Sequence, residues 1–445
     1  MKYCNRCLYP ENHPYGILFD SAGVCSGCRV HEEKDFLNWQ ERFKLLKGIV
    51  EKNKSTSSES FFDCIVPVTG GGDSFFTVYV VKELLGLNPL LVNYNHQYNT
   101  RVGIRNLANL TTVFDCELVT STLSPLLIKK ITKSTIRNFG SIYWHVLAGY
   151  TTFPVKVAVR FRTPLIIWGV NSWSEQTGMY SHLDEVEMTE RCRKEHGLMG
   201  ISAEELLEAD KSLEYSDLNE FRYPSDEEIE EIGVRGIYLN NYIRWDSKKQ
   251  HELMIEKYGY ETAEQYRTFN TYEDVNCAHS AGLHDYLKFL KLGYSKVTDH
   301  ACREIRLKRM TREEGIKMVK KYTFKEPNDI DLFLNWIGME KNEFFYCINQ
   351  YRDKKIWDKV SSDSWKLKDS IIYHLKDDGV DNVRLEKIEN CEFIVTQNRK
   401  DFLNQETYLL MGRSYIDKYN YGSILDKPGD EKFSKRDWKF PDITK

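Results

Sequence analysis

The sequence contains no run of 18 or more apolar residues, so it offers no candidate for a transmembrane helix. Its first residues, MKYCNRCLYP, also lack the apolar segment that a secretory signal carries. The 62 basic and 66 acidic residues nearly balance, and the net charge of -4 differs from the positive excess of dedicated nucleic-acid-binding proteins. We therefore expect a cytoplasmic protein that neither inserts into a membrane nor binds nucleic acid.

The length and composition of the chain are typical of a soluble protein with more than one domain. It has 445 residues, of which 41% are hydrophobic, and this is enough to build a sizeable core. Local composition predicts four parts. They are a zinc ribbon over 1–32, a helix and polar linker over 33–60, an α/β domain over 61–325 with an acidic helical insertion at about 202–231, and a mostly helical region and tail over 326–445.

Four of the eleven cysteines are arranged like the ligands of a metal ion. Cys4 and Cys7 form one C-x2-C pair, Cys25 and Cys28 form another, and 17 residues separate the pairs. Two such knuckles can close four thiolates tetrahedrally around Zn²⁺. We predict a structural zinc site that leaves no coordination position open for catalysis.

A nucleophilic cysteine is the alternative interpretation of this region. The stretch GVCSG at 23–27 fits the G-x-C-x-G pattern of a nucleophile elbow, and His31 follows it closely. An elbow, however, needs a buried strand before it and a histidine that arrives from a distant loop. The zinc interpretation is therefore preferred, and the other seven cysteines are expected mainly in the core.

Strand-like and helix-like segments alternate in the first half of the chain. Strands are predicted over 61–68, 89–95, 117–120 and 163–171, and helices over 32–50, 74–86, 101–114 and from 124 onward. Such alternation predicts an α/β fold, in which helices cover both faces of a parallel sheet. Ligands bind sheets of this kind at the carboxyl ends of the strands.

The stretch VPVTGGGDSFF at 66–76 has three consecutive glycines where the first predicted strand turns into a helix. Free amides and the dipole at the start of a helix favour an anion, and phosphate is the expected one. The stretch lacks the lysine of a Walker A motif, and Phe75 stands where a dinucleotide fingerprint needs its third glycine. A tight turn without a ligand is the competing interpretation.

The motif TGGGDS, from Thr69 to Ser74, resembles the S-G-G-x-D-S pyrophosphate loop (PP-loop) of the adenine nucleotide alpha hydrolase-like enzymes, which split ATP into AMP and pyrophosphate. Thr69 keeps the hydroxyl group of the usual serine. Gly72 stands in a slot that is often lysine in these enzymes, so a charge that would assist a phosphate is missing. The resemblance implies that the α/β domain binds ATP and that Asp73 holds Mg²⁺ or positions the loop.

The order of segments along the chain is similar to that of the N-acetyl sugar amidotransferases of bacterial surface-glycan synthesis. Those enzymes begin with a zinc ribbon whose sequence is similar to CNRCLYP…GVCSGC, and the pyrophosphate loop follows it. The likeness extends through WGVN at 168–171, IRWD at 243–246 and the stretches 283–315 and 331–345, and it ends near residue 357.

This resemblance implies a particular reaction. ATP adenylates the acetamido oxygen of a nucleotide-activated N-acetyl sugar, and ammonia then replaces that oxygen, which leaves an acetamidino group. The sequence holds no credible glutaminase, because Lys2 stands where an N-terminal nucleophilic cysteine would be. A separate glutaminase subunit is therefore the implied source of ammonia.

The resemblance also implies roles for individual residues. The implied catalytic residues are Asp73, Ser74, Asp299 and Arg306; the nucleotide-binding residues are Thr69, Gly70, Gly71, Gly72, Asp73, Ser74, Asn171 and Glu175; and the sugar-binding residues are Trp245, Lys291, Arg303 and Arg309. His300 is expected as a hydrogen-bonded support rather than as a general base. From residue types alone, the basic stretch 291–309 also fits a solvated helix face, and Trp245 also fits a packing anchor.

Two other functions remain open. A tRNA-thiolating enzyme would also combine zinc-binding cysteines with a pyrophosphate loop, and Cys116 and Cys192 are the candidates for its catalytic cysteines. The acidic charge balance argues against the basic surface that tRNA needs. The third interpretation is an inactive relative that serves as a scaffold, and it rests only on the departures at Thr69 and Gly72.

Overall fold

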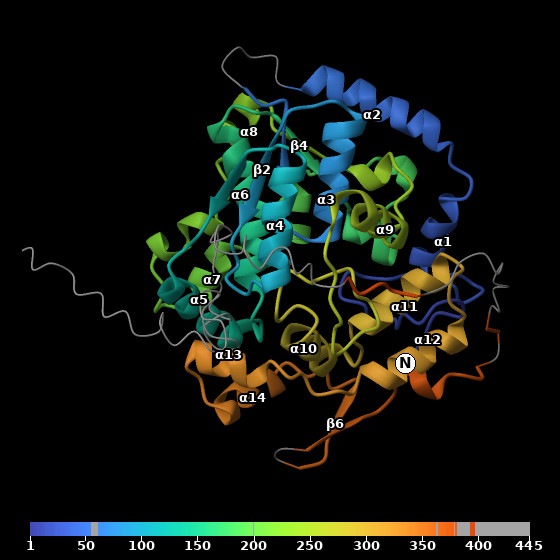
Figure 1. The fold of residues 1–445 in the computed structure, drawn as a ribbon. Helices are drawn as coiled ribbons and strands as arrows, with labels where there is room; N and C mark the ends of the chain where they lie inside the picture. Colours follow the sequence, from blue (N-terminus) through green and yellow to red (C-terminus); the bar gives the residue numbers. More distant parts are fainter. Residues whose placement is uncertain (55–60, 199, 362–363, 378, 381–391, 397–445) are drawn as a thin grey trace, which may run out of the picture.

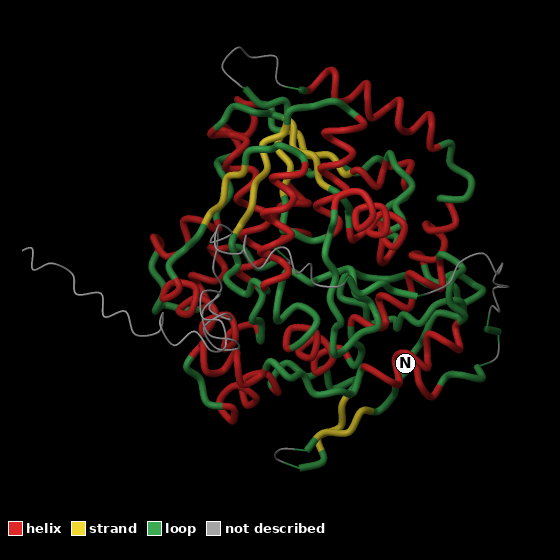
Figure 2. Tube along the Cα trace, in the orientation of Figure 1, coloured by secondary structure: helices red, strands yellow, loops and turns green. Residues whose placement is uncertain are grey.

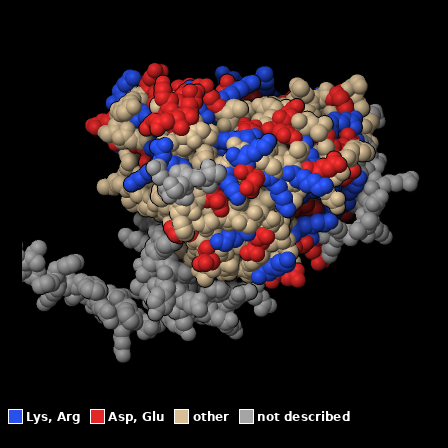
Figure 3. Space-filling model, turned by 90° about the horizontal axis from the view of Figure 1, so that it is seen from above, with Lys and Arg blue, Asp and Glu red and all other residues tan. Residues whose placement is uncertain are grey.

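A computed structural model of the chain describes residues 1–54, 61–198, 200–361, 364–377, 379–380 and 392–396 (Figure 1). In this view a sheet covered by helices forms the upper part of the molecule, and helices joined by long loops form the lower part (Figure 2). From above, basic and acidic side chains are interspersed over much of the surface (Figure 3), in keeping with the near balance of charge. In the described part of the chain, no helix has both the length and the apolar character needed to span a bilayer.

Five parallel strands form the central sheet, and this confirms the predicted α/β class. They are β1 (Cys64–Pro67), β2 (Pro89–Tyr94), β3 (Leu118–Ser121), β4 (Leu165–Trp168) and β5 (Arg235–Tyr238). Their order in the sheet is β3-β2-β1-β4-β5. The strands β1, β2 and β4 lie within the predicted segments, and β3 ends one residue beyond its segment, at Ser121. The sequence analysis missed β5, because Arg235 and Gly236 interrupt the apolar character of this short strand.

Each face of the sheet has its own apolar core, because successive strand residues point to opposite sides. Cys64 and Val66 of β1 lie in one core, and Ile65 lies in the other. The first core is closed by α2 (Trp39–Asn53), α3 (Gly72–Tyr79), α4 (Arg101–Val113) and α9 (Ser247–Tyr258), and the second by α6 (Trp144–Arg160) and α8 (Asp226–Ile232). Helices therefore cover both faces, as predicted.

The N-terminal segment packs against the second half of the chain. Its helix α1 (Ser26–Glu33) begins within the second cysteine knuckle and contains Cys28, and the knuckles share a core with α11 (Lys296–Arg306) and α12 (Arg312–Tyr322). The single helix predicted over 32–50 is wrong, because α1 ends at Glu33 and α2 begins separately at Trp39. The side chain of Asn38 caps α2 by accepting hydrogen bonds from two amides of its first turn, and this fixes the new start.

The acidic stretch 202–231 is helical, as expected, and one side of it is buried. It contains α7 (Ala203–Ala209), a 3-10 helix (Tyr215–Phe221) and α8. Both α-helices begin with a capping box, formed by Ser202 with Glu205 and by Ser225 with Glu228. Leu206, Leu218 and Phe221 anchor this stretch in a core that also contains residues of α6 and of α5 (Pro125–Phe139).

The C-terminal region is helical at first and then forms a short hairpin. The remaining elements are α10 (Leu283–Leu292), α13 (Ile330–Ile337), α14 (Lys341–Asn349) and the antiparallel strands β6 (Trp357–Lys359) and β7 (Trp365–Leu367). Short 3-10 and π-helical turns cover Val80–Leu84, Trp173–Thr177, His182–Asp184, Cys192–Gly197, Leu239–Asn241 and Ile371–Tyr373. The end of the predicted tail, residues 397–445, lies outside the described residues.

Candidate active site and metal centre

The glycine loop connects β1 to α3 and is closed by its own hydroxyl groups. The amide of Thr69 donates to the Ser74 hydroxyl at 2.9 Å, and the amide of Gly71 donates to the Thr69 hydroxyl at 3.3 Å. Gly70 has a φ of +78°, and a Cβ atom there would lie 2.8 Å from the carbonyl oxygen of Gly103. Glycine is required at position 70, because the backbone is left-handed and the neighbouring backbone is close.

A cavity of about 310 Å³ opens beside this loop, at the carboxyl end of β1. The predicted site residues that line it are Thr69, Gly71, Gly72, Asp73, Glu175, Trp245, Asp299, Arg303 and Arg306. Gly70 and Ser74 belong to the same loop, and Ser74 is buried where its hydroxyl holds the loop closed. The structure thus brings the glycine loop and α11 together, although more than 200 residues separate them in the sequence.

Two predicted site residues make their contacts away from the cavity wall. The side-chain oxygen of Asn171 accepts a hydrogen bond from the amide of Trp173 at 3.0 Å. Lys291 donates to the carbonyl of Phe139 at 3.2 Å, and burial lowers the pKa of Lys291 to about 8. These contacts hold both side chains within the fold.

Arg309 and Trp245 both have structural contacts, but only Trp245 lines the cavity. Arg309 forms ion pairs with Asp246 at 2.9 Å and with Glu304 at 2.6 Å, and thereby joins α9 to α11. Trp245 is 2% exposed, and its ring meets the edge of Phe76 with 5.5 Å between the ring centroids. Trp245 is therefore packed in the core and also lines the cavity.

A network of charged side chains forms the α11 end of the cavity. His300 lies between the Thr268 hydroxyl, 2.7 Å from Nδ1, and the Glu273 carboxylate, 3.1 Å from Nε2. Arg303 forms an ion pair with the same carboxylate. Burial by itself would raise the pKa of Glu273, but Arg303 and His300 lower it well below its usual range. His300 is hydrogen-bonded within this network, as expected of a supporting residue.

Further ion pairs lie on both sides of the network around Glu273. Asp299 pairs with Lys288, and Asp274 pairs with Lys296 at 2.5 Å. Burial would raise the pKa of Asp299, but Lys288 lowers it below its ordinary value. The α11 end is thus lined by carboxylates that are already matched with cations.

Glu175 meets side chains from the N-terminal segment. Lys34, which is 1% exposed, forms an ion pair with Glu175 and donates to the carbonyl of Trp245 at 3.0 Å. His31 lines the cavity, and its Nε2 atom lies 4.0 Å from the Glu175 carboxylate. Burial, together with Lys34 and Arg306, lowers the pKa of His31 well below its usual range.

Arg306 connects the cavity to the cysteine cluster. Its guanidinium donates to the carbonyls of Glu175 and Gln176 at 3.1 and 2.8 Å, and to the sulfur of Cys25 at 3.5 Å. It also lies 5.1 Å from the ring centroid of Tyr9. Burial would lower the pKa of Arg306, but the nearby cysteine sulfurs raise it well above its ordinary value.

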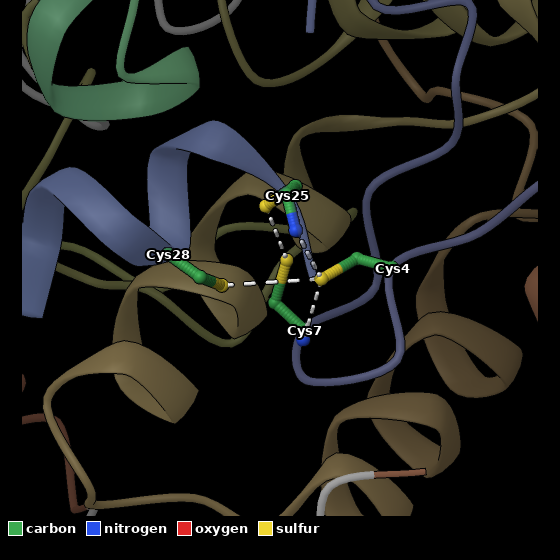
Figure 4. A group of neighbouring side chains, drawn as sticks. All are labelled: Cys4, Cys7, Cys25 and Cys28. Carbon is green, nitrogen blue, oxygen red and sulfur yellow. Dashed lines mark hydrogen bonds between the residues drawn. The ribbon is translucent and has the colours of Figure 1, made fainter. Parts of the chain in front are cut away.

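The four predicted cysteines gather into one buried cluster (Figure 4). The sulfurs of Cys4, Cys7, Cys25 and Cys28 all lie within 4.8 Å of one another. The amides of Cys7 and Cys25 donate to the sulfur of Cys4 at 3.4 and 3.2 Å. Metal–sulfur bonds of about 2.3 Å place the corners of a tetrahedron about 3.8 Å apart, so the cluster has the dimensions of a site for a single ion.

A family comparison accounts for the part of the chain that contains α11. Residues 252–371 match the LPS biosynthesis protein WbpG-like, C-terminal domain. This stretch is therefore similar to a WbpG-like C-terminal domain. The matched stretch supplies Asp299, Arg303 and Arg306 to the cavity, whereas the glycine loop comes from the α/β part before it.

Other similarities are more distant. The uncharacterized protein MJ1599 of Methanocaldococcus jannaschii is 25% identical over 118 residues, which cover 26% of this chain and 41% of that protein. The chain thus matches less than half the length of this relative.

Three solved structures also resemble the chain. They are an NH3-dependent NAD synthetase from Campylobacter jejuni (16% identity, 33% of this chain and 62% of that chain), an NMN synthetase from Francisella tularensis (13%, 50% and 87%) and the U34-tRNA thiolase NcsA from Methanococcus maripaludis with its 4Fe-4S cluster (12%, 74% and 91%). Each has a TM-score of 0.26, which is too low to transfer any feature of their sites.

Several residues of the cavity wall lie outside the sequence predictions. They are His31, Ser247, His251, Glu273, Asp274 and Lys296. One signal was available, since Ser247 and His251 are spaced by one helical turn and therefore share a face of α9. Glu273 and Asp274 lie on a loop, whose course no periodicity predicts.

Proposed function

We propose that this chain is an ATP-dependent amidotransferase, which converts the acetamido group of a nucleotide-activated N-acetyl sugar into an acetamidino group. The single observation that carries the proposal is the shared cavity. A glycine loop suited to pyrophosphate lies on one side of it, and α11 of the WbpG-like domain lies on the other. The family description, LPS biosynthesis, supports a sugar of the surface glycans and hence a reaction in the cytoplasm.

The reaction needs ATP because an amide oxygen is a poor leaving group. In the first proposed step, the acetamido oxygen attacks the α-phosphate of ATP, and pyrophosphate leaves with the electrons of the broken bond. In the second step, ammonia adds to the former carbonyl carbon. AMP then leaves with the oxygen, and loss of protons yields the acetamidino group.

The loop end is suited to the departing pyrophosphate. The amides at the start of α3 and the Thr69 hydroxyl would stabilise the negative charge that develops there. Ser74 would act through the shape of the loop, because its hydroxyl accepts the hydrogen bond from the Thr69 amide. Asp73 lines the cavity and offers a carboxylate to Mg²⁺, a cation that neutralises phosphate charge when it is bound.

The α11 end is suited to the polar, uncharged groups of the sugar part of the substrate rather than to its phosphates. Arg303 and Lys296 are matched with Glu273 and Asp274, so this wall offers both donors and acceptors in fixed positions. Hydroxyl and amide groups of a sugar use both kinds of partner. A polyanion such as tRNA would instead need unmatched cations.

The alternative, tRNA thiolation, needs a catalytic cysteine beside the nucleotide. Among the described residues that line the cavity, none is a cysteine. The sulfur of Cys192 donates to the carbonyl of Glu187 at 3.2 Å, and that of Cys116 donates to the carbonyl of Phe114 at 3.3 Å. This arrangement favours the amidotransferase over the thiolation enzyme.

The cysteine cluster is proposed to hold a structural Zn²⁺. Four thiolates complete a tetrahedral coordination and leave no position for a reacting water. Its role would be to hold Tyr9 and His31 in the cavity wall and to fix Arg306 through Cys25.

Ammonia is proposed to come from a separate glutaminase subunit. At neutral pH ammonia is almost wholly ammonium, which is not a nucleophile. The isolated chain is therefore expected to need high ammonium concentrations and to react faster as the pH rises, whereas glutamine is expected to suffice when the partner is present. Efficient use of glutamine by the pure chain would remove the need for a partner.

Mass spectrometry of candidate nucleotide-activated N-acetyl sugars, incubated with ATP and ammonium, tests the reaction. The expected product is lighter by the difference between O and NH, and AMP and pyrophosphate accumulate with it. Formation of ADP and phosphate would show that the loop is wrongly assigned. AMP formation without any change in the mass of the sugar would overturn the amidotransferase reaction.

A further inference from the structure

His251 contacts the glycine loop from a distant part of the chain. It lies on α9, one turn after Ser247, and both residues line the cavity. Its side chain is 1% exposed, and its ring packs against Tyr260 and Tyr272, with 5.9 and 5.4 Å between the ring centroids. The imidazole is therefore held in one place within the wall of the site.

One edge of this ring fills the space in front of Gly72. A Cβ atom at Gly72 would lie 2.0 Å from Cδ2 and 2.4 Å from Nε2 of His251, so no larger residue fits unless the ring moves. Gly72 is the first residue of α3, and its φ lies outside the left-handed range. The imidazole, rather than the backbone conformation, is thus what requires glycine at this position.

The hydrogen-bonding capacity of the ring is unused within the described part of the chain. Neither ring nitrogen has a hydrogen-bond partner among those residues. Nε2 lies 3.2 Å from Oδ1 of Asp73, which also lacks a hydrogen-bond partner there, so the contact between them is electrostatic. A buried polar atom without a partner is unfavourable, and a ligand in the cavity would supply the partner.

We propose that His251 is a phosphate-contacting residue of the glycine loop. An anion bound by the amides at the start of α3 would meet the Nε2 edge of the ring. The imidazole would then donate, from α9, a hydrogen bond that position 72 cannot donate because it has no side chain. This inference rests on the proposed use of ATP, and it adds a residue that binds the pyrophosphate part of the nucleotide.

Binding of ATP, pyrophosphate and AMP, measured by calorimetry with Mg²⁺ but without sugar or ammonium, tests the inference. His251→Phe keeps a ring against the two tyrosines but removes both nitrogens, and His251→Ala removes the ring. Both variants are expected to bind ATP and pyrophosphate about tenfold more weakly or worse. Their affinity for AMP is expected to stay within about twofold of the wild-type value.

A second pair of variants separates phosphate contact from packing. In His251→Ala/Gly72→Lys, the lysine can enter the vacated space, and pyrophosphate binding is expected to recover. The matched control His251→Ala/Gly72→Ala adds only a methyl group and is expected to stay weak. Gly72→Lys alone is expected to lower the melting temperature, because the new side chain meets the ring of His251. If the alanine variants do not fold, His251→Phe alone decides the matter.

Three results would overturn the inference. They are equal weakening of ATP and AMP binding by His251→Phe, an unchanged affinity of that variant for pyrophosphate, and failure of the wild-type chain to bind either ATP or pyrophosphate. The amidotransferase reaction fails differently. If the chain binds pyrophosphate through His251 but never yields an acetamidino product, the proposed reaction is contradicted and the proposed phosphate contact is not.

Discussion

The two ends of the cavity are built from different chemical groups. The loop end offers backbone amides and the hydroxyl of Thr69, all within one strand-to-helix turn. The α11 end offers charged side chains in matched pairs, such as Arg303 with Glu273 and Lys288 with Asp299. Backbone amides suit any phosphate, whereas a set of matched charges fits only a ligand whose donors and acceptors have the right positions. The first end therefore suits phosphate groups in general, and the second suits a ligand with one particular arrangement of polar groups.

The two ends also differ in their dependence on the rest of the fold. The loop needs β1 and α3, which adjoin it in sequence. The α11 end needs the N-terminal segment, because Arg306 contacts Cys25 and because Lys34 holds Glu175. Damage to the cysteine cluster should therefore disturb the α11 end before it disturbs the loop end.

Removal of the metal is expected to have the largest effect and to disrupt the α11 end of the cavity. Cys25→Ser, or chelation, should release one zinc ion per chain and lower the free energy of unfolding, since structural thiolate sites contribute on the order of 10 kcal/mol in small peptides. Metal analysis and thermal unfolding measure this. Cys116→Ser, which lies outside the cluster, should keep its zinc. Absence of zinc in protein prepared without chelators would contradict the prediction.

Substitutions in the glycine loop are expected to impair the loop end of the cavity and to leave the α11 end intact. Asp73→Ala and Ser74→Ala should each slow the formation of AMP and pyrophosphate about a hundredfold or more, because preorganised groups around the leaving phosphate are lost. The zinc content and the melting temperature should change little. Thr112→Ala, an exposed hydroxyl on α4, is the control and should react at the wild-type rate. Wild-type rates in the loop variants would show that the loop does not bind the reacting phosphates.

Removing one charge from the α11 network should destabilise the fold more than removing one charge from an exposed ion pair. Arg303→Ala removes the arginine partner of the Glu273 carboxylate, leaves only His300 beside it, and is expected to lower the free energy of unfolding by about 3 kcal/mol. Arg137→Ala breaks an exposed pair with Glu343 and should cost about 0–1 kcal/mol. Urea denaturation measures both values. Equal losses would mean that the α11 network stabilises the fold no more than a surface pair does.

The pH dependence of stability gives the smallest and most specific test. The pKa of Glu273 is lower in the folded chain than in the unfolded chain, so its carboxylate stabilises the fold above the unfolded value of about 4.3. This contribution is lost as the pH falls through the folded pKa. Glu273→Gln should therefore reduce the loss of stability between about pH 5 and lower values, as measured by urea denaturation. An unchanged pH profile would contradict the lowered pKa.

The sequence predicted those features that depend on residues close together in the chain. The two C-x2-C pairs predicted a single cluster, and alternation predicted four of the five strands. The glycines at 70–72 predicted the strand-to-helix turn, because three small residues in succession leave the amides open. The missed strand β5 is short and partly polar, so neither its period nor its composition distinguishes it.

Only the tertiary structure decided which distant residues meet at the cavity. The basic stretch 291–309 predicted ligands at several positions, yet Lys291 and Arg309 bind other parts of the protein. From the sequence, Gly72 was interpreted as the loss of a charged side chain. The structure shows that the ring of His251 occupies the space that a side chain at position 72 would need. A contact between residues 72 and 251 depends on how α9 packs against α3, and no pattern within either segment encodes it. Local sequence determines which chemical groups each wall of the cavity carries. Packing between helices, strands and loops determines which of these walls face each other.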